Sequence, residues 1–165
     1  MRTLLPEDIL PLCELTRRTA MFREDEVETL GEVLADFLDA NHRYSHRCLV
    51  ETDGAGAPIG LIYFAPESMT IRGWNVWWIV VDANAQGKGL GSRLLAAAES
   101  AIADENGRLI LIETSSLPKY EPTWRFYLRN GYDLKATVAD YYADGDDMLI
   151  YTKRAAVVDD PNRIR

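Results

Sequence analysis

The spacing of hydrophobic residues along this chain changes repeatedly between the helical period and the strand period. Apolar residues recur at every third or fourth position in four segments, which predicts helices over residues 6–16, 24–40, 90–106 and 122–130. Short apolar or alternating runs predict strands over residues 1–5, 48–51, 59–64, 74–81, 109–113, 132–138 and 147–152. The predicted order is therefore one strand, two helices, three strands, a helix, a strand, a helix and two strands.

These elements are enough for one domain. With 165 residues, the chain is long enough to bury a sizeable core, and we expect the domain to span residues 1–154. The polar residues 155–165 are expected to form a disordered tail. Within the domain, the apolar residues of 109–113 follow one another without alternation, which is typical of a strand buried on both faces.

Composition and charge narrow the classes of function. The chain is 47% hydrophobic and 27% charged, which is ordinary for a globular protein. Its net charge of −8 argues against binding to nucleic acid, because phosphate contacts need clustered Lys and Arg. The same charge either favours cationic substrates or simply keeps the protein soluble.

The cysteines and histidines indicate neither a disulfide framework nor a metal site. Cys13 and Cys48 stand far apart in apolar runs, which predicts reduced core cysteines. His42 and His46 lack neighbouring cysteine or acidic ligands, so no metal is expected. The first residues form no signal segment, and no run reaches the ~18 apolar residues of a membrane span, so we expect a cytoplasmic protein with no membrane partner.

The most informative segment is the glycine-rich turn between the fourth predicted strand and the third predicted helix. The first N–H groups of a helix have no partner within it, and the helix dipole adds positive charge, so such a turn suits a phosphate. A P-loop fails because Asp82 stands at its first glycine, and the dinucleotide pattern G-x-G-x-x-G fails at Ser92. A third pattern, Gln/Arg-x-x-Gly-x-Gly/Ala, is matched by Gln86, Gly89 and Gly91. The alternative is a turn that only packs the helix tightly against the strand.

A second motif lies downstream, where the segment 126–132 reads Phe-Tyr-Leu-Arg-Asn-Gly-Tyr. With these two motifs, the chain resembles the GNAT superfamily of N-acetyltransferases. The resemblance implies an α/β (α+β) fold with a single mixed, mostly antiparallel central sheet of about seven strands, flanked by about four helices. It also implies an enzyme whose cofactor is acetyl-CoA.

The resemblance assigns two groups of residues to acetyl-CoA. In GNAT enzymes the fourth strand pairs through its backbone with the pantetheine arm, and the matching residues here are Ile79, Val80 and Val81. The residues that match the pyrophosphate-binding turn are Gln86, Gly87, Lys88, Gly89, Leu90, Gly91 and Ser92. Lys88 either lends charge to the phosphates or is an ordinary solvated lysine.

Two residues match catalytic positions of the family. Tyr127 matches the tyrosine that protonates the leaving thiolate, and Glu113 matches the glutamate that serves as base in ribosomal-protein N-terminal acetyltransferases. On the helix, Phe126 is expected to face the core and Tyr127 another side. The structural alternatives are a half-buried Tyr127 with its hydroxyl satisfied locally and a Glu113 paired with a lysine or arginine.

The acceptor side is expected to use residues from several loops and strands: Phe22, Glu24, Trp78, Tyr141 and Tyr142. Alternation along a strand puts Trp77 and Trp78 on opposite faces of the sheet, so at most one should line the groove. Acids such as Glu24 more often serve a helix N-terminus, and Tyr141 and Tyr142 are equally suited to cover the sheet edge.

We therefore expect an N-acetyltransferase that transfers the acetyl group of acetyl-CoA to a primary amine of a small molecule or a peptide by direct attack. The alternative is a non-catalytic module that binds acyl-CoA or a nucleotide, and a dinucleotide-binding enzyme is a more distant one. Tyr127 and Glu113 favour catalysis. The sequence does not identify the acceptor amine, and it leaves open whether the protein forms a homodimer.

Overall fold

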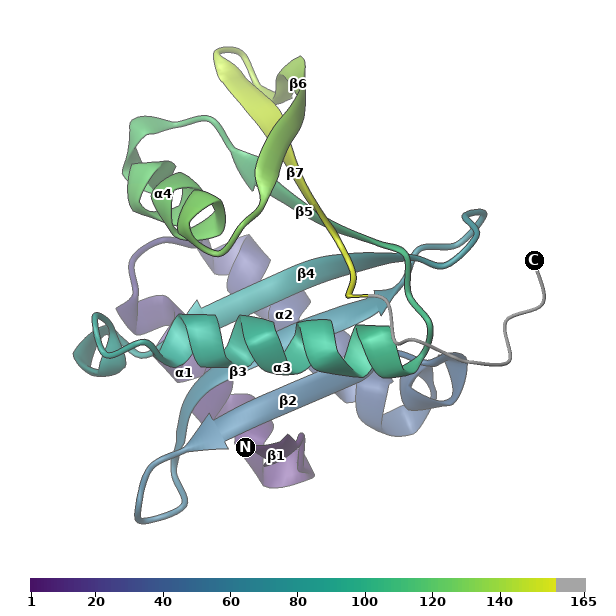
Figure 1. Cartoon of the computed structure of the whole chain (residues 1–165). Coiled ribbons are helices and arrows are strands. Elements are labelled where there is room, and N and C mark those ends of the chain that lie inside the picture. The colour runs from purple at the N-terminus through teal and green to yellow at the C-terminus, as the bar shows by residue number, and fades with distance from the viewer. Residues whose placement is uncertain (157–165) are drawn as a thin grey trace, which may run out of the picture.

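The computed structural model describes residues 1–156, and these form a seven-stranded sheet with helices on both faces (Figure 1). The strand order across the sheet is β1-β2-β3-β4-β5-β7-β6. Neighbouring strands are antiparallel, except that β4 and β5 are parallel. The strands are β1 (Arg2–Thr3), β2 (Arg47–Thr52), β3 (Pro58–Pro66), β4 (Gly73–Val81), β5 (Leu109–Ser115), β6 (Asp133–Ala143) and β7 (Asp146–Arg154).

Helices cover both faces of this sheet. Those in the described residues are α1 (Ile9–Arg18), α2 (Glu24–Asp39), α3 (Leu90–Asp104) and α4 (Glu121–Arg129). The leucines of α1 and α2 share one core cluster with Leu61 and Tyr63 of β3. Those of α3 share a second cluster with Ile62 and Phe64, the residues of β3 that point to the opposite face. In Figure 1, α3 accordingly crosses in front of the sheet while α1 and α2 lie behind it.

The predicted order of elements and the mixed, mostly antiparallel sheet are confirmed, with two corrections. β6 runs to Ala143 rather than ending at Val138, because it continues its pairing with β7 although its side chains are exposed and show no hydrophobic pattern. β5 is not buried on both faces. Ile110 and Ile112 are buried on the α3 side, whereas Glu113 is exposed on the other.

The two parallel strands β4 and β5 part from each other soon after they meet. Their register is limited to the pairs Gly73–Leu109, Trp74–Ile110 and Asn75–Leu111. Beyond Asn75, β4 continues to Val81 and β5 to Ser115, and Figure 1 shows the two ribbons diverging. The sheet therefore has an opening in its middle, with an unpaired edge of β4 on one side.

A β-bulge interrupts β4 at this opening. Tyr63 pairs with Trp78 and Phe64 pairs with Val76, so Trp77 has no partner on β3. A bulge places one extra residue in the strand and shifts the alternation of side chains between the two faces. After the bulge, Trp78 packs in the cluster of α1 and α2, whereas Val76 before it packs in the cluster of α3.

The end of the described chain is packed against the domain. Ala155 is buried, and its N–H donates to the carbonyl oxygen of Arg108 at 3.2 Å. Most of the tail predicted at 155–165 falls at residues 157–165, which lie outside the described residues. Among the described helices, none combines the length and the apolar character that crossing a membrane requires.

Candidate active site

The glycine-rich turn has the backbone conformation that its sequence predicts. Gly87 and Gly89 have φ angles of +74° and +77°, a left-handed region that favours glycine. Gly89 is the N-cap of α3, and its carbonyl accepts the N–H of Arg93 at 3.1 Å. The turn is exposed, so the free N–H groups at the start of α3 are open to an anion.

Side chains of the turn fix its shape. The Gln86 amide donates to the carbonyl of Val81 at 3.1 Å, and the Lys88 ammonium donates to the carbonyl of Asn84 at 3.0 Å. Lys88 is exposed, and this hydrogen bond holds its ammonium group beside the turn. Asp82 anchors the start of the turn by accepting the N–H of Asn84 and pairing with Arg18.

Gly91 has a packing role rather than a conformational one. A Cβ atom at this position would lie 3.2 Å from the Phe126 ring of α4. A glycine here lets α3 and α4 approach closely beside the opening of the sheet. The two sequence motifs, which lie far apart in the chain, therefore meet at the contact of Gly91 with Phe126.

The unpaired edge of β4 presents backbone groups to the opening. The N–H of Asp82 donates to the carbonyl of Ile59 on β3 at 3.0 Å. Since successive N–H groups of a strand point to opposite sides, those of Val81 and Ile79 point away from β3, toward the opening. The N–H of Val80 points to β3. Ile79 and Val81 thus have the geometry to pair with an extended ligand, as an added strand would.

Tyr127 lies on the α3 side of the opening. Tyr127 is buried within the core cluster, a place expected for Phe126; Phe126 is partly buried and packs against the same cluster. The Tyr127 ring packs against Tyr132 and Tyr151, with centroid separations of 6.2 and 5.6 Å. Burial raises the pKa of Tyr127, and Tyr151 and Tyr142 add to the effect, so its hydroxyl keeps its proton at neutral pH.

Glu113 lies on the opposite side, facing α2. Burial raises the pKa of its carboxyl group, and the negative charge of Glu67 raises it further. The carboxylate is nonetheless reached by solvent through the open groove. No lysine or arginine among the described residues forms an ion pair with Glu113, so the pairing that was its structural alternative is not observed.

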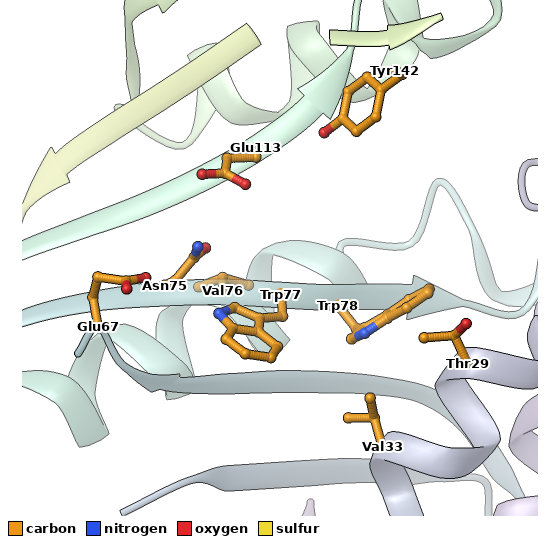
Figure 2. Close-up of a pocket in the computed structure, with 9 residues that line it drawn as sticks. All are labelled: Thr29, Val33, Glu67, Asn75, Val76, Trp77, Trp78, Glu113 and Tyr142. Carbon is orange, nitrogen blue, oxygen red and sulfur yellow. The ribbon is translucent and has the colours of Figure 1, made fainter. Parts of the chain in front are cut away.

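A groove of about 470 Å³ surrounds Glu113 on this face (Figure 2). Residues from α2, β4, β5 and β6 and from the loop after β3 line it: Thr29, Val33, Glu67, Asn75, Val76, Trp77, Trp78, Glu113 and Tyr142. In Figure 2 the Tyr142 hydroxyl points toward the Glu113 carboxylate across the upper part of the groove. Burial and the nearby Glu113 raise the pKa of Tyr142 to about 12.

Both tryptophans of β4 line the groove, so the expectation that at most one would do so is wrong. The bulge at Trp77 shifts the alternation by one residue, and Trp77 and Trp78 come to lie on the same face. Sequence reasoning also missed Glu67 and Asn75. Neither belongs to a motif, and only the register of the folded sheet brings them to the groove.

Three other residues expected on the acceptor side, Phe22, Tyr141 and Glu24, differ in how they lie relative to the groove. Phe22 is not among the lining residues, but it packs on Trp78, which is, with ring centroids 5.5 Å apart. Tyr141 packs edge-on against Tyr142 at 5.0 Å and is exposed. Glu24 lies outside the groove lining, where it pairs with Arg17 at 2.6 Å, and this hydrogen bond lowers its pKa.

Comparisons with known proteins agree with the motifs and the fold. The model of an acetyltransferase (GNAT) domain matches residues 44–134. A solved structure from Desulfovibrio desulfuricans, assigned to the GNAT family of acetyltransferases, is 30% identical, with a TM-score of 0.90 over 94% of this chain and 98% of its own. No match is found among curated protein sequences.

Two more distant structures share the fold. An aminoglycoside 6′-N-acetyltransferase complexed with coenzyme A is 18% identical, with a TM-score of 0.74 over 94% of this chain and 95% of its own. A chimeric spermidine N-acetyltransferase from Vibrio cholerae and hSSAT is also 18% identical, with a TM-score of 0.77 over 93% of each chain.

The parted strands, the glycine turn and these matches define an acyltransferase that binds acetyl-CoA. The chain belongs to the GNAT superfamily of acetyltransferases.

Proposed function

We propose that this protein transfers the acetyl group of acetyl-CoA to a primary amine of a small molecule or a peptide, by direct attack of the amine on the thioester. Glu113 is the base that receives a proton from the incoming ammonium, and Tyr127 is the acid that protonates the departing thiolate. Acetyl-CoA, when bound, supplies an acetyl group already activated as a thioester.

One observation carries this proposal: β4 and β5 part between Tyr127 on one face of the sheet and Glu113 on the other. Tyr127 stands on the α3 side of the opening, and Glu113 stands on the groove side. A thioester held along β4 would have the acid on its sulfur side and the base on its amine side. The new C–N bond forms as the C–S bond breaks, so one proton leaves the nitrogen and one is delivered to the sulfur.

The residues present fit the cofactor. The N–H groups of Ile79 and Val81 face the opening and can pair with the amides of the pantetheine arm. The backbone of residues 87–92 would hold the pyrophosphate at the positive end of α3, with the Ser92 hydroxyl as an additional donor. Val80 belongs to the same strand, but its N–H points to β3 rather than to the cofactor. Gln86 and Lys88 shape the turn through hydrogen bonds from their side chains to backbone carbonyls.

A primary amine is the acceptor that the groove favours. Its lining includes two carboxylates and three large aromatic side chains, and none of the nine described lining residues is basic. Such a surface attracts a cation and stabilises it over aromatic faces. The aminoglycoside and spermidine enzymes that share this fold act on amines.

The test of this function is release of CoA thiol from acetyl-CoA with a panel of small amines and short peptides. We expect amine-dependent release, with the acetylated amine detected by mass spectrometry. Tyr127→Phe should lower kcat by about 10²-fold, the usual scale for a proton-transfer group, while CoA affinity is unchanged.

Tyr151→Phe is the matched control, because it removes the hydroxyl of a ring that packs on Tyr127. A Tyr127→Phe enzyme with full rate would contradict the assignment of the acid. Absence of amine-dependent thiol release with every amine tried would contradict the function itself.

A further inference from the structure

The groove contains an acid that the transfer step does not use. Glu67 follows β3, is half-buried and lines the groove together with Glu113. No cation among the described residues pairs with the Glu67 carboxylate. The groove thus holds two carboxylates and no balancing charge from its own lining.

Asn75 adds a second, independent observation. The residue is only 8% exposed, and its Oδ1 atom has no hydrogen-bond partner among the described residues. Asn75 lines the groove, and Figure 2 shows it between Glu67 and Glu113. Buried polar atoms are nearly always paired, so an unpaired acceptor that faces a groove points to a donor on a ligand.

The sheet register shows how these three groups are spaced. Asn75 pairs with Ala65 of β3 on one side and with Leu111 of β5 on the other. Glu67 lies two residues beyond Ala65, and Glu113 lies two residues beyond Leu111. Because β3 runs opposite to β4 and β5 runs with it, the two acids lie on opposite sides of Asn75 along the strand direction. A ligand that meets both acids must therefore be extended.

Aromatic side chains line the same groove as the two acids. Trp77 is 50% exposed and Tyr142 is 44% exposed, and both line the groove together with Trp78. Their rings offer apolar surface to an alkyl chain and an attractive face to an ammonium group.

We propose that the acceptor is a diamine or polyamine, whose second ammonium group is held by the Glu67 carboxylate and the Asn75 Oδ1 atom while the reacting amine faces Glu113. This assignment rests on the proposed function, and it names the substrate class of the same site. A monoamine with one positive charge satisfies Glu113 and leaves Glu67 without a counter-charge. A dication satisfies both acids and supplies the donor that Asn75 lacks.

The experiment compares three acceptors with the same four-carbon chain: diaminobutane, aminobutanol and butylamine. Aminobutanol replaces the second ammonium with a neutral hydroxyl, so it isolates the second charge. Binding to the CoA-loaded protein is measured by calorimetry at neutral pH, which reports affinity whether or not transfer occurs. We expect diaminobutane to bind about tenfold more tightly than aminobutanol.

Glu67→Gln should remove this preference, because it should lower the affinity for diaminobutane much more than the affinity for aminobutanol or butylamine. Glu14→Gln is the matched control, because it makes the same change at an exposed acid of α1 outside the groove lining, and it should retain the preference. Equal affinity of the wild type for diaminobutane and aminobutanol would overturn the inference, as would a preference that survives in Glu67→Gln. Acetyl transfer to the same amines is followed separately, so a protein that prefers the dication without acetylating any amine would refute the proposed function alone.

Discussion

At Glu113, burial and the charge of Glu67 act in the same direction on one carboxyl group. A carboxyl whose pKa is raised by the fold is a better base near neutral pH, but its ionised form is held in an unfavourable environment. Tyr127 is complementary, because its raised pKa keeps it protonated as a donor. The residue types and motif positions of both were visible in the sequence. Their pKa shifts and their approach from opposite faces depend on the fold.

The raised pKa of Glu113 predicts a linkage between pH and stability. Between its unfolded and folded pKa values the folded protein binds more protons, so stability falls as pH rises through that window. Glu113→Gln removes the titration. We expect the variant to be at least as stable as the wild type at neutral pH and to lack this decline, as measured by Tm against pH.

The same variant should lose activity where the base is needed. Its kcat/KM should fall mainly at low and neutral pH and recover at higher pH, where the amine deprotonates without help. Comparing the profile of Tm against pH with that of kcat/KM against pH distinguishes a catalytic carboxylate from a structural one. A Glu113→Gln protein that is less stable at neutral pH, with an unchanged pH–rate profile, would assign Glu113 to the fold instead.

At the scale of elements, the order of helices and strands was more predictable than the pairing register between strands. Hydrophobic spacing predicted the order of helices and strands because each spacing is set within one element. The bulge at Trp77 has no comparable signal, since it depends on how β4 pairs with β3. The bulge brings Trp77 to the same face as Trp78, so strand alternation alone left Trp77 out of the groove. Glu67 and Asn75 were missed for the same reason.

The start of α3 allows a test of the phosphate site that spares the fold. Gly89→Val would strain a left-handed residue, so a loss of binding would be ambiguous. Ser92→Glu instead places an acid in the first turn of α3, where it stabilises the helix by about 0.3–1 kcal/mol but repels a pyrophosphate. We expect CoA affinity to fall by about tenfold or more in calorimetry, with Tm unchanged or raised.

Ser100→Glu is the matched control, because it makes the same substitution on α3 about 12 Å along the helix. It should leave CoA affinity unchanged. If Ser92→Glu and the wild type bind CoA equally, the pyrophosphate does not occupy the start of α3.

In the proposed reaction, acetyl-CoA and the acceptor approach from separate faces of one sheet. The glycine turn and Tyr127 belong to the α3 side, and the groove around Glu113 belongs to the α2 side. Both substrates can therefore be bound together, which direct attack requires. A covalent acetyl-enzyme would need a nucleophile in the site, and the two cysteines do not serve. Burial raises the pKa of both thiols, that of Cys48 to about 12, and neither lines the groove.

This arrangement predicts sequential kinetics. With acetyl-CoA and the best acceptor both varied, double-reciprocal plots of initial rates should intersect, because both substrates must be bound before the acetyl group moves. A Cys13→Ala, Cys48→Ala double variant should keep the same pattern, and its fold can be checked by its CoA affinity. Parallel lines, or an acetyl adduct on the protein after incubation with acetyl-CoA alone, would show a covalent route. In that case the two substrates would occupy the opening between β4 and β5 one after the other rather than together.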